Sequence, residues 1–468
     1  MSHPIVLYSP RGEGLVLPLG LVQVGSTTPE DRVVVIDGRV ELAPEARVVE
    51  LADDALCLGV SVLTGAPIGD ALRVSRAAKT RNARLPVIWG GWHPSLVPEQ
   101  CLASGVVDAC VVGQGERTLA TVMDALRQGR GFDGIPGVVW RRDTEVVRNL
   151  PRAVEDVNAF PAADFGLLDM ERYFRFRGVR RLDYCSSQGW PSEYGLGLEP
   201  RGAERRWTGL AAARVVSEVK SHAGRYRLQE LFFGDSDFFA DLGRAEAISR
   251  GFVEAGVRVP WSGRGRANLL SRLTDEQLRL MRASGCFRVN VGAEGEGPDE
   301  GILETAEKLH RAGIGARFSF VAGLPQESKE ELARTYRTAK AIREIDGEFE
   351  TPIHFCALYP GTPLAERMPS LGLATPRTLE DWEKLDRDRS IGPWISESVR
   401  RAVPRYNFYL RHGYQKPGRR FGKRLLHHVA RARAKTNFYA FDLERRAVDL
   451  SKRLRTGLNR QPPPSAQD

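Results

Sequence analysis

Titratable side chains that could exchange protons gather in two short segments of the sequence, at Asp183, Tyr184, Glu193, Tyr194, Asp235 and Asp237. Carboxyl and phenol groups act as general acids or bases when a fold brings them to one site. We expect catalysis from the last four of these residues. Asp235 and Asp237 also suit a simpler role, because aspartate is a common N-cap at the start of a helix.

The six cysteines are scattered along the chain, at Cys57, Cys101, Cys110, Cys185, Cys286 and Cys356. No two have the C-x-x-C spacing that is typical of metal sites, and the pattern does not suit a disulfide framework. We therefore expect reduced thiols, most of them in the protein core, and no metal site.

Three loops with glycine and other small residues follow predicted strands in the first part of the chain. They are Leu58–Gly65 (LGVSVLTG), Val87–Pro94 (VIWGGWHP) and Val111–Thr118 (VVGQGERT). Ligands of open α/β sheets bind beyond the carboxyl ends of the strands, and glycine lets the backbone approach a ligand closely. The loops therefore predict a ligand site at one edge of a sheet.

The elements that must position these loops follow from the periodicity of apolar residues. In the first 130 residues, helical segments alternate with short β-branched runs at Ile5–Tyr8, Val33–Ile36, Ala55–Val60, Pro86–Trp89 and Val106–Val112. This alternation predicts βαβ units and a parallel sheet.

The second half repeats the alternation after a connector near residues 151–165. We expect strands at Leu228–Phe233, Val257–Trp261, Phe287–Val291, Ala316–Val321 and Glu348–Leu358. Helices are expected between them at Leu210–Ala223, Arg244–Ala255, Thr274–Ala283, Ile302–Ala312 and Ser328–Ile345. Five or six βα units predict a full or partial parallel barrel.

The composition is that of a globular protein, with 42% hydrophobic and 27% charged residues in 468. No apolar run reaches the roughly 20 residues of a membrane span, and the start does not resemble a signal peptide, so we expect a cytoplasmic protein. The net charge of +9 is uneven, because the segment from Arg400 to Arg460 is rich in arginine and lysine. Aromatic residues recur there, which favours basic amphipathic helices that cap the fold. Contact with an acidic substrate or a membrane surface stays open, and nucleic acid is not expected.

The three glycine-bearing loops together resemble the cobalamin-binding domain of B12-dependent radical SAM enzymes. The resemblance implies cobalamin contacts from Ser61, Thr64, Gly65, Gly90, Gly91, His93, Gly113, Gln114, Gly115 and Glu116. The D-x-H-x-x-G signature that supplies an imidazole to cobalt is absent. We therefore expect no histidine on cobalt, and His93 is expected to structure its loop or contact the nucleotide tail.

The second half resembles a radical SAM barrel in four phrases. These are Leu231–Asp241 (LFFGDSDFFAD), Val289–Gly297 (VNVGAEGEG), Phe318–Pro325 (FSFVAGLP) and Leu358–Leu364 (LYPGTPL). The resemblance implies that Glu294 contacts the ribose of S-adenosylmethionine (SAM), with Gly292 and Gly323 beside the ligand. Arg266, and also Arg264, could grip the carboxylate of SAM in place of a metal.

The resemblance breaks at the first barrel strand. Members of this family carry three cysteines there, as C-x-x-x-C-x-x-C, which hold three irons of a 4Fe–4S cluster. Here the phrase reads SQGWPSEYGLG over 187–197, with Trp190, Tyr194 and Gly197 at the cysteine places. None of these side chains supplies a thiolate, so the cluster is expected to be absent.

The expected fold is α/β: an N-terminal flavodoxin-like (Rossmann-type) cobalamin-binding domain, a full or partial TIM-like radical SAM barrel, and a basic helical C-terminal region. The expected boundaries are 1–150, a linker at 151–180, 181–375, 376–460, and a disordered tail at 461–468. The sequence does not predict an oligomeric state.

Three functional hypotheses follow, all with a small-molecule substrate. The first is methyl transfer from SAM through cobalamin, without a 5′-deoxyadenosyl radical, in the biosynthesis of a specialised metabolite. The second is a cobalamin-supported non-radical cyclisation or rearrangement. The third is a non-catalytic partner protein. Cobalamin is the expected cofactor, with SAM or S-adenosylhomocysteine as a further ligand.

Overall fold

The computed structural model describes residues 3–12, 14–28, 32–189, 206–293, 299–325, 327–385, 394–418, 421–439 and 441–458. Its N-terminal part is built on a seven-stranded sheet in the order β2-β1-β3-β4-β5-β6-β7. Five strands are parallel: β1 (Ile5–Ser9), β2 (Val33–Asp37), β3 (Cys57–Ser61), β4 (Val87–Gly90) and β5 (Ala109–Val111). Their order is that of a flavodoxin-like sheet.

Two antiparallel strands extend this sheet beyond the predicted ones. They are β6 (Val138–Arg142) and β7 (Glu145–Arg148), joined by a tight turn in which Asp143 has a positive φ of 53°. We did not predict this hairpin, because β7 is mostly exposed and its sequence lacks the apolar alternation of a half-buried strand.

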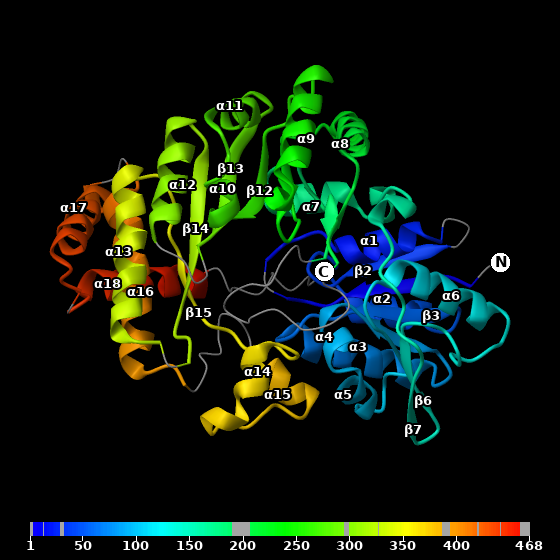
Figure 1. Ribbon diagram of the computed structural model, residues 1–468. Helices are drawn as coiled ribbons and strands as arrows, with labels where there is room; N and C mark the ends of the chain where they lie inside the picture. Colours follow the sequence, from blue (N-terminus) through cyan, green and yellow to red (C-terminus); the bar gives the residue numbers. More distant parts are fainter. Residues whose placement is uncertain are drawn as a thin grey trace, which may run out of the picture.

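Helices cover both faces of the N-terminal sheet (Figure 1). One face packs against α1 (Leu19–Ser26) and α6 (Gly115–Arg127), and the other against α2 (Pro44–Leu51) and α3 (Pro67–Arg81). Two short helices, α4 (Trp92–Leu96) and α5 (Pro98–Ala103), follow β4. Because both faces are covered, the central strands are apolar throughout.

The second part is a six-stranded parallel sheet in the order β15-β14-β13-β12-β11-β8. Its strands are β8 (Arg181–Tyr184), β11 (Glu230–Phe233), β12 (Trp261–Arg266), β13 (Cys286–Gly292), β14 (Gly315–Ala322) and β15 (Ile353–Phe355). The order runs along the chain and ends at two free edges among the described residues, as in a partial barrel. A small antiparallel pair, β9 (Ser187–Gln188) and β10 (Thr208–Gly209), follows β8. The helices of this part are α7 (Met170–Arg177), α8 (Ala212–Tyr226), α9 (Leu242–Glu254), α10 (Ala267–Leu270), α11 (Asp275–Ala283), α12 (Asp299–Arg311) and α13 (Lys329–Ile345).

One barrel strand lies further along the chain than we predicted. The predicted strand Val257–Trp261 ends where β12 begins, so Arg264 and Arg266 lie on the strand and not in the loop after it. The apolar pattern fails here because Gly263 and Gly265 face Phe238 and Phe239, whose rings fill the space that larger strand residues would take.

The C-terminal segment returns to both parts of the molecule. The short helices α14 (Pro363–Arg367) and α15 (Leu379–Glu383) pack with the N-terminal domain near α3, whereas α16 (Glu397–Tyr414) packs on α13 and β15. Asn407 of α16 exchanges two hydrogen bonds with the backbone of Ile353, at 2.9 and 2.7 Å. Two more helices, α17 (Phe421–Thr436) and α18 (Leu443–Leu458), complete the described fold. None of the helices described is long and apolar enough to cross a membrane.

Candidate functional site

A cavity of about 250 Å³ lies at the carboxyl edge of the N-terminal sheet. The ends of β3, β4 and β5 form its floor, and the beginnings of α1 and α6 form its sides. Seven of the residues predicted to contact cobalamin line it: Ser61, Gly90, Gly91, Gly113, Gln114, Gly115 and Glu116. The remaining three, Thr64, Gly65 and His93, do not line this cavity.

Backbone conformation explains two of the cavity glycines. Gly91 has a φ of 92°, and a Cβ atom there would lie 3.1 Å from the Ser61 hydroxyl and 3.2 Å from the Val62 nitrogen. Gly113 has a φ of 81°. Both conformations belong to the left-handed region that glycine adopts without strain, so the two loops can approach each other at the cavity wall.

His93 is fully buried behind its loop. Its Nδ1 atom lies 3.0 Å from the Thr64 hydroxyl, its backbone N–H donates to Val62, and its ring makes an edge contact with Trp382. Burial lowers the pKa of His93 to about 4, so the ring is neutral at physiological pH. These contacts tie the loop between β4 and α4 to the protein core.

Gln188, a residue we did not predict, joins the cavity to the barrel. It lies in β9, and its amide nitrogen donates to the Glu116 carboxylate at 2.6 Å. Its amide oxygen accepts from Gln114 at 3.1 Å. Burial raises the pKa of Glu116, which is the opposite of what the hydrogen bond from Gln188 does. The partners lie about 70 residues apart in sequence, so no local pattern could reveal this contact.

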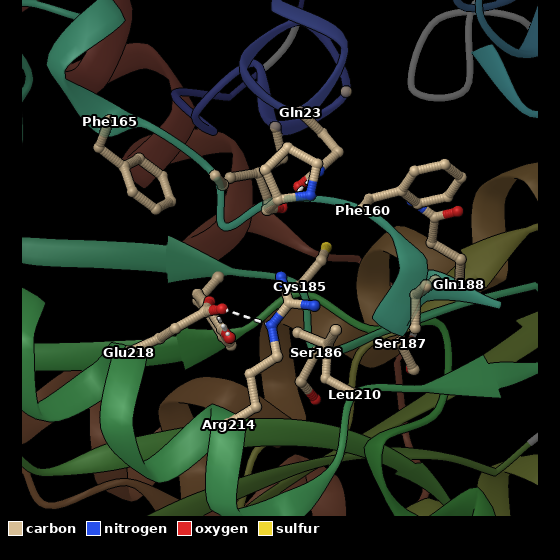
Figure 2. A pocket seen from close by; sticks show the side chains of 16 residues that line it. Gln23, Phe160, Phe165, Cys185, Ser186, Ser187, Gln188, Leu210, Arg214 and Glu218 are labelled. Carbon is tan, nitrogen blue, oxygen red and sulfur yellow. Dashed lines mark hydrogen bonds and ion pairs between the residues drawn. The ribbon is translucent and has the colours of Figure 1, made fainter. Parts of the chain in front are cut away.

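A second cavity, of about 260 Å³, adjoins the first, because Gly20 and Gln188 line both. Figure 2 shows Phe165 and Phe160 on opposite sides of it, with Arg214 and Glu218 facing each other. Glu218 accepts from Arg214 at 2.7 Å and from the Tyr184 hydroxyl at 2.8 Å. Burial and the neighbouring Glu218 carboxylate raise the pKa of Tyr184. The phenol therefore stays protonated and acts as a donor.

Asp235 holds the loop after β8 in place. It is buried and accepts hydrogen bonds from the Ser186 backbone at 3.2 Å, from the Ser186 hydroxyl at 2.9 Å and from the Ser187 hydroxyl. Arg244 supports the same loop by donating to the Ser186 carbonyl at 2.7 Å. Burial raises the pKa of Asp235, although the two serines oppose this.

Asp237 has the capping role that its sequence position also suited. Its side chain accepts from the backbone of Phe239 at 3.0 Å, at the start of the 3-10 helix Phe238–Ala240. The other carboxylate oxygen accepts from Arg266 Nε at 2.8 Å. Arg266 is therefore held at the carboxyl end of β12.

The other residues expected near SAM lie at strand ends. Gly292 ends β13, and Gly323 follows β14 with a φ of 79°. The Gly323 backbone is fixed from both sides, since its N–H donates to Glu327 and its carbonyl accepts from Trp394. Five predicted residues lie outside the described residues: Trp190, Glu193, Tyr194, Gly197 and Glu294.

Five of the six cysteines are buried, and Cys185 alone is exposed, in the wall of the second cavity. The buried ones are divided between the cores of the two sheets: Cys57, Cys101, Cys110, Cys286 and Cys356. Across the part of the chain that the structure describes, no three His, Cys, Asp or Glu residues are grouped as metal ligands would be.

Comparison with known proteins finds a match for the domain that holds the first cavity. The B12 binding domain family matches residues 11–123, which include all three glycine-bearing loops. The N-terminal region is a B12-binding domain. An uncharacterized methyltransferase (PH0819) of Pyrococcus horikoshii is 28% identical over 415 residues, which cover 84% of this chain and 88% of the relative. The anaerobic magnesium-protoporphyrin IX monomethyl ester cyclase of Synechocystis is 23% identical, over 59% of this chain and 56% of that one.

Most of the chain shares its fold with cobalamin-dependent radical SAM enzymes. The structure of the radical SAM methyltransferase TsrM from Kitasatospora setae, with cobalamin and a [4Fe-4S] cluster bound, superposes with a TM-score of 0.69. The identity is 17%, and the match covers 93% of this chain and all of TsrM. The predicted fold class and family resemblance are therefore confirmed. The relatives are named as a methyltransferase and a cyclase, which supports an enzyme.

Proposed function

We propose that this protein is a cobalamin-dependent methyltransferase that moves a methyl group from SAM to a small molecule without a 4Fe–4S cluster. The observation that carries the proposal is the contact through Gln188. This residue hydrogen-bonds Gln114 and Glu116 in the wall of the first cavity, which we call the B12-binding cavity. It lies two positions before Trp190, the first of the three places where the family has cysteine. The proposed cofactor site therefore contacts the strand that leads into this segment, which has no cysteine at the three aligned places.

The B12-binding cavity fits the nucleotide tail of cobalamin. Its floor is glycine backbone, its sides are apolar, and its polar groups are few. This lining would let the nucleotide tail of cobalamin approach the sheet edge closely. The apolar wall residues include Leu7, Leu21, Val60, Ile88 and Leu119. When bound, cobalamin supplies a cobalt centre that can carry a methyl group. His93 is buried and does not line this cavity, which supports cobalt without a histidine ligand.

The residues present do not fit a 4Fe–4S cluster. Three thiolates are needed at one loop, and Cys185 is the cysteine nearest to this loop in the sequence. The other five cysteines are buried in the cores of the two sheets. The proposed methyl transfer therefore has no step at a cluster.

The chain's own residues are proposed to bind and orient the two reactants. Gly292 and Gly323 would leave room for SAM at the ends of β13 and β14, and Glu294 would accept from its ribose hydroxyls. Asp237 fixes Arg266 beside them, which supports a contact with the carboxylate of SAM.

Asp235 is proposed to be a positioning residue, because all its hydrogen bonds go to Ser186 and Ser187. The proton transfers that a substrate requires would then fall to Glu193 or Tyr194, which follow the loop that Asp235 holds.

The substrate class is proposed to be a small specialised metabolite. Cyclisation of a small molecule is the second candidate function, because relatives of this chain include two anaerobic cyclases. A non-catalytic partner role has less support, since the similar proteins are named as enzymes.

The test is to incubate the cobalamin-loaded protein with SAM and a chemical reductant, and to follow the nucleoside products. Methyl transfer predicts S-adenosylhomocysteine that depends on cobalamin. A cyclase that uses cobalamin alone predicts that SAM is unchanged. Formation of 5′-deoxyadenosine would contradict the proposal, because that product requires electron delivery through a cluster.

A further inference from the structure

The positive charge of this protein is concentrated in its C-terminal helices. Residues 400–460 contain 18 arginines and lysines and three acids, a net charge of +15. Because the whole chain has +9, the remaining residues have a net charge of −6. Neither the fold nor the proposed function accounts for this separation.

The three acids of this segment are all used inside it. Asp442 is fully buried and binds Arg405, Arg445 and Arg446. Burial alone would raise the pKa of Asp442, but Arg445 and Arg405 outweigh it and bring the pKa to about 2. Glu444 accepts from the Tyr409 hydroxyl and from Arg433, and Asp449 accepts from Arg445. The acids therefore stabilise the helices and do not neutralise their outer face.

Helix α17 has one face against α16 and one toward solvent. Ala430 and Ala434 are buried, and the two helices approach closely at Gly413, where a Cβ atom would lie 2.9 Å from the Arg431 nitrogen. The exposed residues of α17 are Phe421, Gly422, Lys423, Arg424, Leu425, His428, Arg431, Ala432, Lys435 and Thr436, and from Leu425 on they recur at helical spacing. This face contains cations and apolar residues and no acid.

Large apolar side chains are exposed to solvent on α17, on α18 and between these two helices. Phe421 is 82% exposed, Phe441 is 77% exposed and Leu443 is 66% exposed, and Leu425, Phe438 and Leu450 are each more than half exposed. We call the exposed residues of α17, together with Phe438, Phe441, Leu443 and Leu450, the basic apolar surface. Helix α17 lies at the end of the molecule away from the B12-binding domain (Figure 1).

We infer that the basic apolar surface docks this protein on an anionic lipid bilayer. Interfacial helices place lysine and arginine among the headgroups and insert phenylalanine and leucine at the boundary of the acyl chains. Each cation near an anionic membrane surface adds attraction that falls off within a Debye length. Nucleic acid would bind the cations but would not bury these exposed aliphatic and phenyl groups, whereas a bilayer would do both. The inference does not depend on the proposed methyl transfer.

The test is flotation of the full-length, cobalamin-loaded protein with two kinds of vesicle. Vesicles of phosphatidylcholine mixed with phosphatidylglycerol should carry the protein, and vesicles of phosphatidylcholine alone should carry much less. Arg424→Gln with Lys435→Gln should weaken binding about fivefold for each cation removed. Phe421→Ser with Leu425→Ser should also weaken it, and higher salt should weaken the wild-type protein.

Matched controls separate this surface from general effects of charge and exposure. Leu42→Ser removes an 84% exposed leucine from the N-terminal domain, and Arg130→Gln removes an exposed cation there, so both should bind as wild type does. Unchanged circular dichroism would show that the variants fold. Equal binding to both kinds of vesicle, equal loss in the control variants, or binding of an RNA or DNA duplex in place of vesicles would overturn the inference.

Discussion

At the scale of single residues, the burial of His93 should make the stability of the protein depend on pH. Burial lowers its pKa from 6.5 to about 4, so the unfolded chain takes up a proton below pH 6.5 that the folded chain does not. The contribution of neutral His93 to stability is therefore complete above pH 6.5 and is lost as the pH falls toward 4. The total loss is about 3 kcal/mol.

The measurement compares the wild-type protein with His93→Gln in urea unfolding at about pH 7.5 and about pH 4.5. The stability of the variant should fall less over this range. His222 also has a pKa lowered by burial, so a part of the fall should remain in both proteins.

The electron paramagnetic spectrum of the bound cob(II) form should lack axial nitrogen splitting in both the wild-type protein and His93→Gln. Nitrogen splitting that His93→Gln abolishes would show that His93 does bind cobalt.

A second prediction at this scale concerns the missing thiolates. Anaerobic reconstitution with iron and sulfide should give no stoichiometric 4Fe–4S cluster in the wild-type protein, because the loop offers one cysteine at most. The variant Trp190→Cys, Tyr194→Cys and Gly197→Cys should gain a cluster, with iron content and a broad absorption shoulder as the readout. A cluster in the wild-type protein that disappears in Cys185→Ser would show that the motif lies elsewhere.

A third prediction for a single residue concerns Glu294, which we expect to contact the ribose of SAM. Glu294→Ala should weaken SAM binding by about 1 to 3 kcal/mol, the usual cost of losing a hydrogen bond to a charged group. Calorimetry with SAM on cobalamin-loaded protein measures this directly. The matched control is Glu276→Ala, which removes an 84% exposed carboxylate from α11 and should leave SAM affinity unchanged. Equal SAM affinity in wild type and Glu294→Ala would remove Glu294 from the ligand site.

At the scale of elements, the short strand β9 connects the barrel to the B12-binding cavity. Gln188→Ala would leave the buried Glu116 carboxylate without its 2.6 Å hydrogen bond and would release Gln114. We expect cobalamin affinity to fall about tenfold or more, since an unpaired buried acceptor costs about 1 to 3 kcal/mol. Equilibrium dialysis with hydroxocobalamin is the measurement. Gln128→Ala, at the exposed end of α6, is the control and should bind as wild type does.

The same elements show why the sequence predicts some of this site and not the rest. The three loops after β3, β4 and β5 were predictable because each follows a run of apolar, β-branched residues whose carboxyl end must lie at the sheet edge. The placement of β12 was not predictable, since its glycines depend on Phe238 and Phe239 from another segment. Gln188 was not predictable for a related reason. Its role depends on hydrogen bonds with Gln114 and Glu116, which lie far away in the sequence and which only the fold brings close to it.

At the scale of the whole molecule, the two parts are joined by buried polar contacts between distant segments. Asp183 on β8 accepts from the Leu17 backbone at 3.0 Å and binds Arg177. Tyr173 on α7 donates to Asp37 at the end of β2, at 2.5 Å. Buried polar groups are costly when unpaired, so each part completes the hydrogen bonding of the other. The B12-binding domain and the barrel should therefore unfold in one transition.

The C-terminal segment also joins the two parts, because its residue Trp382 packs in the core of the N-terminal domain. A substitution at Trp382 therefore tests whether the two parts unfold together. Trp382 on α15 is 1% exposed, packs against His93 and donates to Gln100 at 2.8 Å, so a segment of the C-terminal half completes the core of the N-terminal domain. Trp382→Ala should destabilise the protein by about 3 to 5 kcal/mol, because it removes a large buried ring. Gln100→Ala keeps the ring and removes its hydrogen bond together with a longer one to the Pro376 carbonyl, at 3.5 Å, and should cost about 1 kcal/mol.

Thermal unfolding followed by circular dichroism and by cobalamin release distinguishes two arrangements of the molecule. If α15 is part of the N-terminal core, Trp382→Ala should lower both midpoints together, because the cobalamin loops rest on the core that the ring fills. A variant that keeps the wild-type midpoint for cobalamin release, while its circular dichroism midpoint falls, would mean that the B12-binding domain is stable without the C-terminal segment. The coupling would then lie in the Asp183 and Tyr173 contacts alone.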